Sequence, residues 1–243
     1  MQNQFARTEL LLGKEAMEKL AASRVAVFGI GGVGGFAAEA LARSSVGALD
    51  LIDNDTVSLS NLNRQIIALH STVGRKKTDV AAERILDINP AVKLKTWPLF
   101  YGPDTASLFD FREYDYVVDA IDTVTGKIGL VMQAREAGVP IICSMGAGNK
   151  LDPAAFEVAD LFSTSVDPLA RIMRTEMKKR GVKKLKVVYS REKPLPAAAD
   201  VEPGEDPAAG RRSVPGSIAF VPSAAGLMLA GHAVMELTAD CRQ

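Results

Sequence analysis

Apolar runs of strand length alternate with stretches of helical periodicity along the first 150 residues of the chain. The runs that predict strands lie at 23–28, 48–53, 92–97, 114–122 and 139–148. The stretches that predict helices lie at 36–47, 74–90 and 125–138, and each ends in glycine or proline. This alternation predicts an α/β fold with a Rossmann-like, doubly wound, mostly parallel sheet, which binds ligands beyond the carboxyl ends of its strands.

The order of elements changes after about residue 150. Strands are predicted at 155–161 and 185–190, on either side of a helix with Asp167 placed to cap it, Pro168 in its first turn and Gly181 past its end. We therefore expect a C-terminal α+β extension packed on the sheet, within a single domain over residues 1–243. Residues 193–213 are rich in Pro, Ala, Gly and acidic residues, which predicts a mobile loop within that domain.

One segment, 217–237, is apolar for nearly the length that a membrane span needs. Pro222 divides it, however, and small residues and His232 lie in its second half. We interpret it as a strand at 218–221 followed by a core helix that opens at Pro222 and Ser223, rather than as a span.

The composition is that of an ordinary globular protein, with 47% hydrophobic and 24% charged residues. Basic and acidic residues both total 29, so nucleic acid binding would need a local patch. The two cysteines, Cys143 and Cys241, give neither a disulfide framework nor a metal-binding pair. Because the N-terminal residues also lack an apolar signal-peptide core, we expect a cytoplasmic protein.

The sequence GIGGVG follows the first predicted strand and opens a helix. Its four glycines, Gly29, Gly31, Gly32 and Gly34, match a loop that offers backbone N–H groups and a helix N-terminus to phosphate. Enzymes that use NAD, FAD or ATP all carry such loops, and tight packing of strand on helix can also require the glycines. The loop alone therefore leaves the ligand open.

The segment DNDTVSLSNLNRQ narrows the choice. One acidic residue at the end of the second strand, Asp53, would be enough to bind the ribose of NAD. Here further polar residues follow it, and they are Asp55, Asn61, Asn63, Arg64, Gln65 and Lys77. Arginine and lysine neutralise polyphosphate, and Asp122 at the end of a later strand is placed to hold Mg²⁺. The joint pattern favours ATP over a redox dinucleotide.

These motifs resemble the ubiquitin-activating-enzyme-like adenylating superfamily of ThiF, MoeB and HesA type, over roughly residues 5–148. The resemblance implies that ATP activates a carboxylate as an acyl-adenylate and that pyrophosphate leaves. It assigns the α-phosphate to Gly32 and its loop, the ribose to Asp53, and Mg²⁺ to Asp122. The residues assigned to the triphosphate are Asn61, Arg64 and Lys77, with Gln65 in support.

The resemblance also implies an N-terminal arginine that reaches the ATP of a second subunit. Arg7 is the matching residue, and an exposed terminal arginine without such a role is the alternative. The predicted catalytic residues are Arg7, Arg64, Lys77 and Asp122.

Members that activate sulfur carriers usually have two Cys-x-x-Cys pairs for zinc, and this chain has none. Over nearly its whole length, and most specifically in GAGNKLDPAAFEVADLFSTSVDPLA, the sequence resembles the tRNA threonylcarbamoyladenosine dehydratases. That family uses ATP and Mg²⁺ to adenylate the threonyl carboxylate of threonylcarbamoyladenosine at position 37 of tRNA, which then cyclises. The resemblance further suggests a monovalent cation (Na⁺ or K⁺) and a homodimer. It leaves open sulfur-transfer partners such as a cysteine desulfurase or a sulfur acceptor.

A basic run over 171–193 is the candidate surface for the tRNA. The candidate residues are Arg171, Arg174, Lys178, Lys179, Lys183 and Lys184. A solvated helix face would have the same composition.

Three other functions stay open at this point: adenylation of the C-terminal glycine of a sulfur carrier, an NAD-dependent oxidoreductase, and a scaffold without activity.

Overall fold

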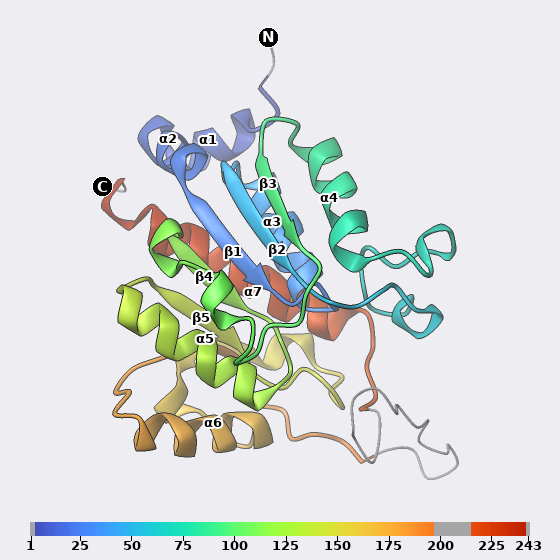
Figure 1. Ribbon diagram of the computed structural model, residues 1–243, viewed down its shortest axis with the longest axis vertical. Helices are drawn as coiled ribbons and strands as arrows, with labels where there is room; N and C mark the ends of the chain where they lie inside the picture. The colour runs from blue at the N-terminus through green and yellow to red at the C-terminus, as the bar shows by residue number, and fades with distance from the viewer. Residues whose placement is uncertain (1–2, 197–214, 242–243) are drawn as a thin grey trace.

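The computed structural model describes residues 3–196 and 215–241 of the 243-residue chain (Figure 1). Its strands are β1 (Arg24–Phe28), β2 (Ala48–Ile52), β3 (Lys93–Trp97), β4 (Tyr116–Asp119), β5 (Ile141–Ser144), β6 (Phe156–Asp160) and β7 (Lys186–Ser190). Its α-helices are α1 (Ala6–Leu12), α2 (Lys14–Ala22), α3 (Gly34–Arg43), α4 (Lys77–Ile88), α5 (Val124–Ala137), α6 (Pro168–Lys179) and α7 (Phe220–Leu237). The predicted strands and helices of the first 150 residues are thus present.

Within the described residues the strands form one seven-stranded sheet in the order β3-β2-β1-β4-β5-β7-β6. Every pairing is parallel except that of β6 with β7. The predicted Rossmann-like, mostly parallel sheet is therefore confirmed, and the C-terminal extension continues it, because β7 pairs with β5. After β1 the chain forms β2 and β3 on one side of β1, and it then crosses to form β4 on the other side. A crevice therefore opens at the carboxyl ends of β1 and β4.

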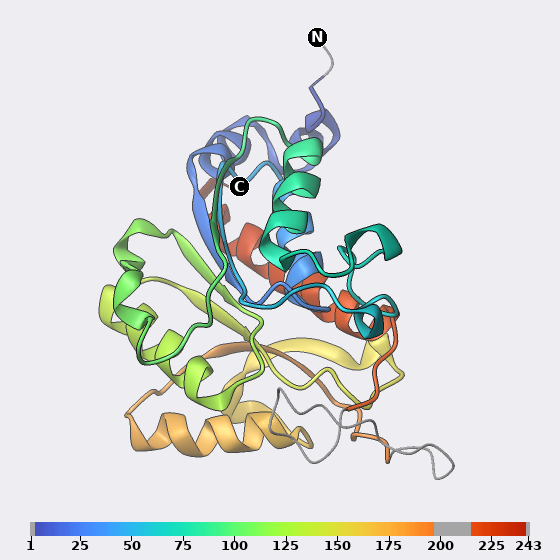
Figure 2. The same ribbon diagram turned by 45° about the vertical axis from the view of Figure 1, so that its right-hand side comes forward.

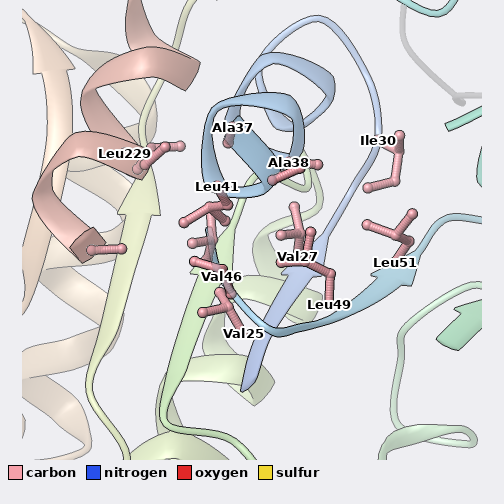
Figure 3. Close-up of a cluster of buried hydrophobic side chains, with 14 of the residues drawn as sticks. Val25, Val27, Ile30, Ala37, Ala38, Leu41, Val46, Leu49, Leu51 and Leu229 are labelled. Atoms are coloured by element: carbon pink, nitrogen blue, oxygen red, sulfur yellow. The ribbon is translucent and has the colours of Figure 1, made fainter. Parts of the chain in front are cut away.

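Helices cover both faces of the sheet (Figures 1 and 2). The alternation of side chains along β1 explains this arrangement, since Val25 and Val27 face α3 and α7 while Ala26 and Phe28 face α5. Figure 3 shows the first of these cores, where Leu41 of α3 and Leu229 of α7 pack over the strands. Each such buried aliphatic side chain stabilises the fold by about 1.5–3 kcal/mol. Two packed faces thus hold the carboxyl ends of the strands in place.

The C-terminal helix α7 differs from its prediction at its start. The strand predicted at 218–221 is wrong, because the helix already begins at Phe220. Pro222 lies in the first turn, where no N–H donor is needed, so it does not interrupt the helix. The prediction of a core helix is confirmed: α7 has the length and apolarity of a membrane span, but half of its residues are buried. It packs closely on α3, since a Cβ at Gly226 would lie 2.2 Å from the carbonyl oxygen of Val33.

Helix α6 starts as predicted. Asp167 accepts a hydrogen bond from the Ala170 N–H at 2.8 Å, and Gly181 past the helix end has a φ of +67°. The mobile loop predicted at 193–213 falls mainly on residues 197–214, which lie outside the described residues. That loop and the single domain over 1–243 stay predictions.

Candidate functional site

A cavity of about 710 Å³ lies at the carboxyl ends of β1, β2, β4 and β5, where the topology places the crevice. The glycine loop forms one wall, which continues with residues 52–55 and with Asn61, Arg64 and Gln65. Segments 120–123 and 144–150 form the opposite wall, together with residues 167–169 at the start of α6. Most of the side chains predicted from the sequence to bind a nucleotide therefore meet in one cavity.

The four predicted glycines divide into two roles. Gly29 has a φ of +88°, and a Cβ on Gly34 would lie 1.7 Å from the Gly29 carbonyl oxygen, so these two allow the loop to turn and α3 to pack against it. Gly34 does not line the cavity, and its role as a nucleotide contact stays a prediction. Gly31 and Gly32 do line it, and the nearest atom to a Cβ on Gly31 would be 3.8 Å away, in Gln65. Backbone at these two positions is open to a ligand.

Asp53 connects the end of β2 to the glycine loop. Its Oδ2 accepts a hydrogen bond from the Ile30 N–H at 2.6 Å, and its Oδ1 accepts one from the Asp55 N–H at 2.9 Å. Burial raises the pKa of Asp53, and the nearby Lys77 opposes that rise. The carboxylate thus fixes the loop, and each oxygen keeps a lone pair for a ligand such as a ribose hydroxyl.

Lys77, the first residue of α4, is the most enclosed cation of this wall, with 5% of its surface exposed. Its Nζ lies 2.7 Å from Asp55 Oδ2 and 4.0 Å from Asp53 Oδ1. The side chain of Asp55 is 57% exposed and can turn outward. An incoming phosphate can therefore replace the Asp55 carboxylate as the partner of the Lys77 ammonium.

The segment 58–65 presents three of its four predicted residues to the cavity, namely Asn61, Arg64 and Gln65. Arg64 Nη1 donates to the Ser60 carbonyl and to Asn63 Oδ1, both at 2.9 Å, and burial lowers the pKa of its guanidinium. Gln65 Oε1 is buried and has no hydrogen-bond partner among the described residues. This oxygen can accept a hydrogen bond from a ligand or a water molecule in the cavity.

Asn63 does not line the cavity, and its role as a nucleotide contact stays a prediction. Its Nδ2 donates to the Ser217 carbonyl at 2.9 Å, and its Oδ1 accepts from Arg64. The side chain therefore ties the 58–65 segment to the chain that leads into α7. Sequence spacing could not separate this tether from its neighbours, because the partner is 154 residues away.

Asp122 lines the cavity just after β4, at the position predicted for a Mg²⁺ ligand. In the part of the chain that the structure describes, no group of three or more His, Cys, Asp or Glu could hold a metal ion by itself. A Mg²⁺ ion bound here would need phosphate oxygens and water for most of its ligands, which is the usual pattern for this ion. The residues present therefore fit a phosphate-bound Mg²⁺.

The remaining predicted residues lie outside the cavity. Arg7 is exposed on α1. Of the basic candidates on and after α6, Arg174 donates to the Thr164 carbonyl at 3.0 Å, and Lys179 pairs with Glu176 at 2.7 Å, so both have structural partners. The four exposed candidates without such a partner among the described residues are Arg171, Lys178, Lys183 and Lys184.

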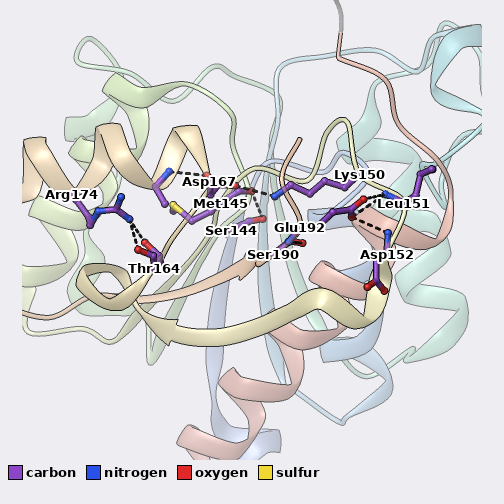
Figure 4. A network of polar contacts seen from close by, with 11 residues as sticks. Ser144, Met145, Lys150, Leu151, Asp152, Thr164, Asp167, Arg174, Ser190 and Glu192 are labelled. Atoms are coloured by element: carbon purple, nitrogen blue, oxygen red, sulfur yellow. Dashed lines mark hydrogen bonds and ion pairs between the residues drawn. The ribbon is translucent and has the colours of Figure 1, made fainter. Parts of the chain in front are cut away.

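The sequence did not single out two buried lysines beside the cavity. Lys150, which lines it, is 2% exposed and donates to Asp167 Oδ2 at 3.1 Å (Figure 4). Lys127 lies beneath the floor, where it pairs with Asp119 and the Ser144 carbonyl. Asp167 was predicted only as a helix cap. The available signal was the polar ending of the strand run at 139–148, which continues into Asn149 and Lys150.

The fold and the cavity together define an α/β protein whose nucleotide pocket carries cations for phosphate beside a glycine loop. The chain belongs to the ThiF family, because the family model matches residues 2–240. A relative from Bacillus subtilis (strain 168) named tRNA threonylcarbamoyladenosine dehydratase is 48% identical to it over 245 residues, which cover 99% of this chain and 96% of the relative. The predicted family resemblance is thus confirmed.

Solved structures with a similar fold include proteins that carry the same name as this relative. This chain is similar to the Escherichia coli tRNA N6-threonylcarbamoyladenosine dehydratase, TcdA, in complex with AMP, with a TM-score of 0.87 and 35% identity over 98% of this chain and 95% of that one. The complex of TcdA with ATP matches over the same shares of the two chains, with a TM-score of 0.86. The similarity includes the C-terminal extension, which the nucleotide motifs alone do not cover.

Proposed function

We propose that this protein is an ATP-dependent tRNA threonylcarbamoyladenosine dehydratase, a carboxylate-adenylating enzyme that cyclises threonylcarbamoyladenosine at position 37 of tRNA. One observation carries the proposal: the phosphate-binding side chains meet around the glycine loop in a chain that matches a dehydratase of this name over 99% of its length. ATP is the nucleotide in one of the similar TcdA structures.

The cavity walls suggest how ATP binds. The backbone at Gly31 and Gly32 approaches the α-phosphate without side chains in the way, and Asp53 accepts from the ribose hydroxyls. Arg64 and Lys77 neutralise the β- and γ-phosphates, with Asn61 and Gln65 as additional polar contacts. Asp122 would hold a Mg²⁺ ion, which would supply Lewis-acid charge to the phosphates when bound. No ligands are assigned to a monovalent cation.

The reaction needs no group from the protein that bonds to the substrate. A carboxylate oxygen of the threonyl group attacks the α-phosphorus, the bond to the β-phosphate breaks, and pyrophosphate leaves. The carbamoyl group of the same modification then attacks the activated carbonyl carbon, loses a proton and expels AMP. Tethering of this kind can reach effective molarities of about 10⁵–10⁸ M. Cys143 fits this scheme, because it is fully buried and burial raises the pKa of its thiol.

The tRNA would approach along α6. Residues 167–169 at the start of this helix line the cavity, and Arg171 and Lys178 are exposed further along it. Lys183 and Lys184 follow on the loop before β7. A homodimer, in which Arg7 reaches the partner's nucleotide, and a cytoplasmic location belong to the same proposal.

The test is to incubate the protein with ATP, Mg²⁺ and threonylcarbamoylated tRNA and to analyse the nucleosides by mass spectrometry. We expect the modified nucleoside to lose the mass of one water molecule while AMP and pyrophosphate accumulate. Pyrophosphate exchange without that loss would contradict the tRNA substrate and would leave adenylation of another carboxylate, such as the C-terminus of a sulfur carrier. Tight binding of NAD and none of ATP would contradict the whole proposal.

A further inference from the structure

A second charged site lies on the wall of the cavity built from β5 and α6. The loop from Met145 to Lys150 follows β5, and Asp167 precedes α6. Both charged side chains of this wall, Lys150 and Asp167, line the cavity while being almost fully buried. None of the roles assigned above to the nucleotide-binding residues uses either of them.

The geometry leaves Lys150 with unused donors. Its ammonium has three N–H bonds, and its one hydrogen-bond acceptor among the described residues is Asp167 Oδ2, at 3.1 Å (Figure 4). The other oxygen of Asp167 is occupied, because it accepts the Ala170 N–H at 2.8 Å. Gly146 makes room for the pair, since a Cβ there would lie 2.8 Å from Asp167 Oδ2. The carboxylate is thus fixed, and it holds the ammonium at the cavity wall.

The backbone that carries Lys150 is fixed as well. Asn149 has a φ of +59°, and it is held in this conformation by a pair of bonds with Gly216. The Asn149 N–H donates to the Gly216 carbonyl at 2.7 Å, and Asn149 Oδ1 accepts from the Gly216 N–H at 2.6 Å. The Leu195 N–H donates to the Asn149 carbonyl at 2.7 Å. Lys150 is therefore positioned before any ligand arrives, which lowers the cost of binding.

The position across the sheet separates Lys150 from the phosphate-binding cations. Lys77 and Arg64 lie on the wall beside β1 and β2, whereas Lys150 follows β5, which is separated from β2 by β1 and β4. Three strand spacings correspond to about 14 Å. The strand ends that lead to these two groups of cations are thus three spacings apart, which leaves the β5 side of the cavity for the acyl substrate of the proposed function.

We propose that Lys150 binds the carboxylate of the acyl substrate through its remaining N–H donors and that Asp167 is the positioning residue that holds it. This inference rests on the proposed function, because the threonyl carboxylate is the anion that enters this half of the cavity. A buried ion pair that only stabilises the fold is the competing explanation, and it makes a different prediction for the paired variant described next.

The test measures binding without ATP, using two tRNAs. One carries threonylcarbamoyladenosine, and the other carries the same group with its carboxylate reduced to a primary alcohol. We expect the unchanged protein to prefer the carboxylate form by about 10- to 100-fold in Kd, the range for a hydrogen bond to a charged group. Lys150→Met should abolish this preference while its Kd for the alcohol form stays within about twofold.

The double variant Lys150→Met with Asp167→Asn separates binding from stability. It removes both charges and keeps an oxygen at position 167 that can accept the Ala170 N–H, so it should fold even if the single variant does not. We expect it to lack the preference too, whereas Lys93→Met, at the exposed start of β3, should retain it. A carboxylate preference in either Lys150 variant would overturn the inference, as would no preference in the unchanged protein.

The inference and the proposed function fail in different ways. If the unchanged protein removes water from the modified nucleoside but binds both tRNAs equally, the role of Lys150 is wrong and the dehydratase stands. If it forms no cyclic nucleoside under conditions where ATP binds, the proposed function itself is wrong.

Discussion

Lys127 of α5 and Asp119 at the end of β4 form an ion pair that is fully buried beneath the candidate site. The Lys127 Nζ donates to both carboxylate oxygens, at 3.0 and 2.9 Å, and to the Ser144 carbonyl at 2.7 Å. Asp119 Oδ1 also accepts the Ile121 N–H at 3.2 Å. Burial raises the pKa of Asp119, and Lys127 opposes that rise. The pair thereby joins the ends of β4 and β5 and fixes the chain that leads to Asp122.

Replacing Lys127 by Met should destabilise the protein strongly, because it leaves the Asp119 carboxylate buried without its counter-charge. Removing one partner of a buried pair costs about 3–5 kcal/mol. Urea unfolding of Lys127→Met and of the exposed control Lys93→Met would measure this, with the control within about 0.5 kcal/mol of the parent protein. Equal unfolding free energies for the two variants would show that the pair does not stabilise the fold.

Alanine at Gly31 should affect ATP binding, whereas alanine at Gly34 should affect stability. The structure has room for a Cβ on Gly31, so Gly31→Ala should fold normally but weaken ATP binding by about tenfold or more, because the methyl group keeps phosphate away from the backbone. A Cβ on Gly34 would overlap the Gly29 carbonyl, so Gly34→Ala should lower the unfolding free energy by about 1–3 kcal/mol. Thermal unfolding with and without ATP measures both effects, and a stable Gly34→Ala variant would contradict this division of roles.

The neighbouring lysines at the start of α4 provide a matched comparison for the phosphate site. Lys77 lines the cavity, whereas Lys76 is exposed and does not. Lys77→Ala should weaken ATP binding by about 10- to 100-fold, the loss expected for a charge-assisted bond, and Lys76→Ala should change it by less than about twofold. Calorimetry with ATP distinguishes the two variants. An equal loss for both would mean that α4 attracts phosphate only through its overall charge.

Acid should destabilise the link between α3 and α4. Burial alone would raise the pKa of Glu39, but hydrogen bonds from Arg84 and Arg43 hold that pKa below its usual value. Because the pKa is lower in the folded state, the ionised carboxylate stabilises the fold above about pH 4.3. This contribution is lost as the pH falls through the folded-state value.

Glu39→Gln should therefore lower the unfolding free energy by about 1 kcal/mol at neutral pH, a modest amount because both arginines are partly exposed. The difference between the two proteins should begin to shrink as the pH falls below about 4.3, where the unfolded chain takes up the proton, and should vanish once the pH is below the lower folded-state pKa of the parent carboxylate. Urea unfolding between neutral and acid pH measures this. A difference that stays constant over that range would rule out the ionised carboxylate as its source.

The sheet could be predicted from the sequence because its strands are short, buried and separated by helices that end in glycine or proline. A run such as Val25 to Phe28 is short, contains β-branched residues and ends at a glycine loop, which favours a buried strand over a helix. That Arg64, Lys77 and Asp122 line one cavity could also be predicted, since each lies in or at the end of a segment that connects a predicted strand to the next helix, and the ends of parallel strands meet at one edge. The succession of strands, loops and helices along the sequence was sufficient to predict these features.

Contacts between distant segments could not be predicted in this way. Lys150 meets Asp167 only because α6 returns to the end of β5, and Lys127 has the sequence context of an ordinary helix surface residue although it is fully buried. The contact of Asn63 with Ser217 cannot be predicted for the same reason, since it depends on the docking of α7. In each case the tertiary fold selects the role of a polar side chain.

The most direct measurement of the proposed reaction follows oxygen-18 from the substrate. The threonyl carboxylate of the modified tRNA is labelled in both oxygens, and the products are analysed by mass spectrometry after turnover with unlabelled ATP and Mg²⁺. If the carboxylate is adenylated and then cyclised, each cyclic nucleoside formed should be accompanied by one AMP that carries one labelled oxygen. Cyclic nucleoside with unlabelled AMP, or with the label in inorganic phosphate beside ADP, would contradict activation of the carboxylate by adenylation.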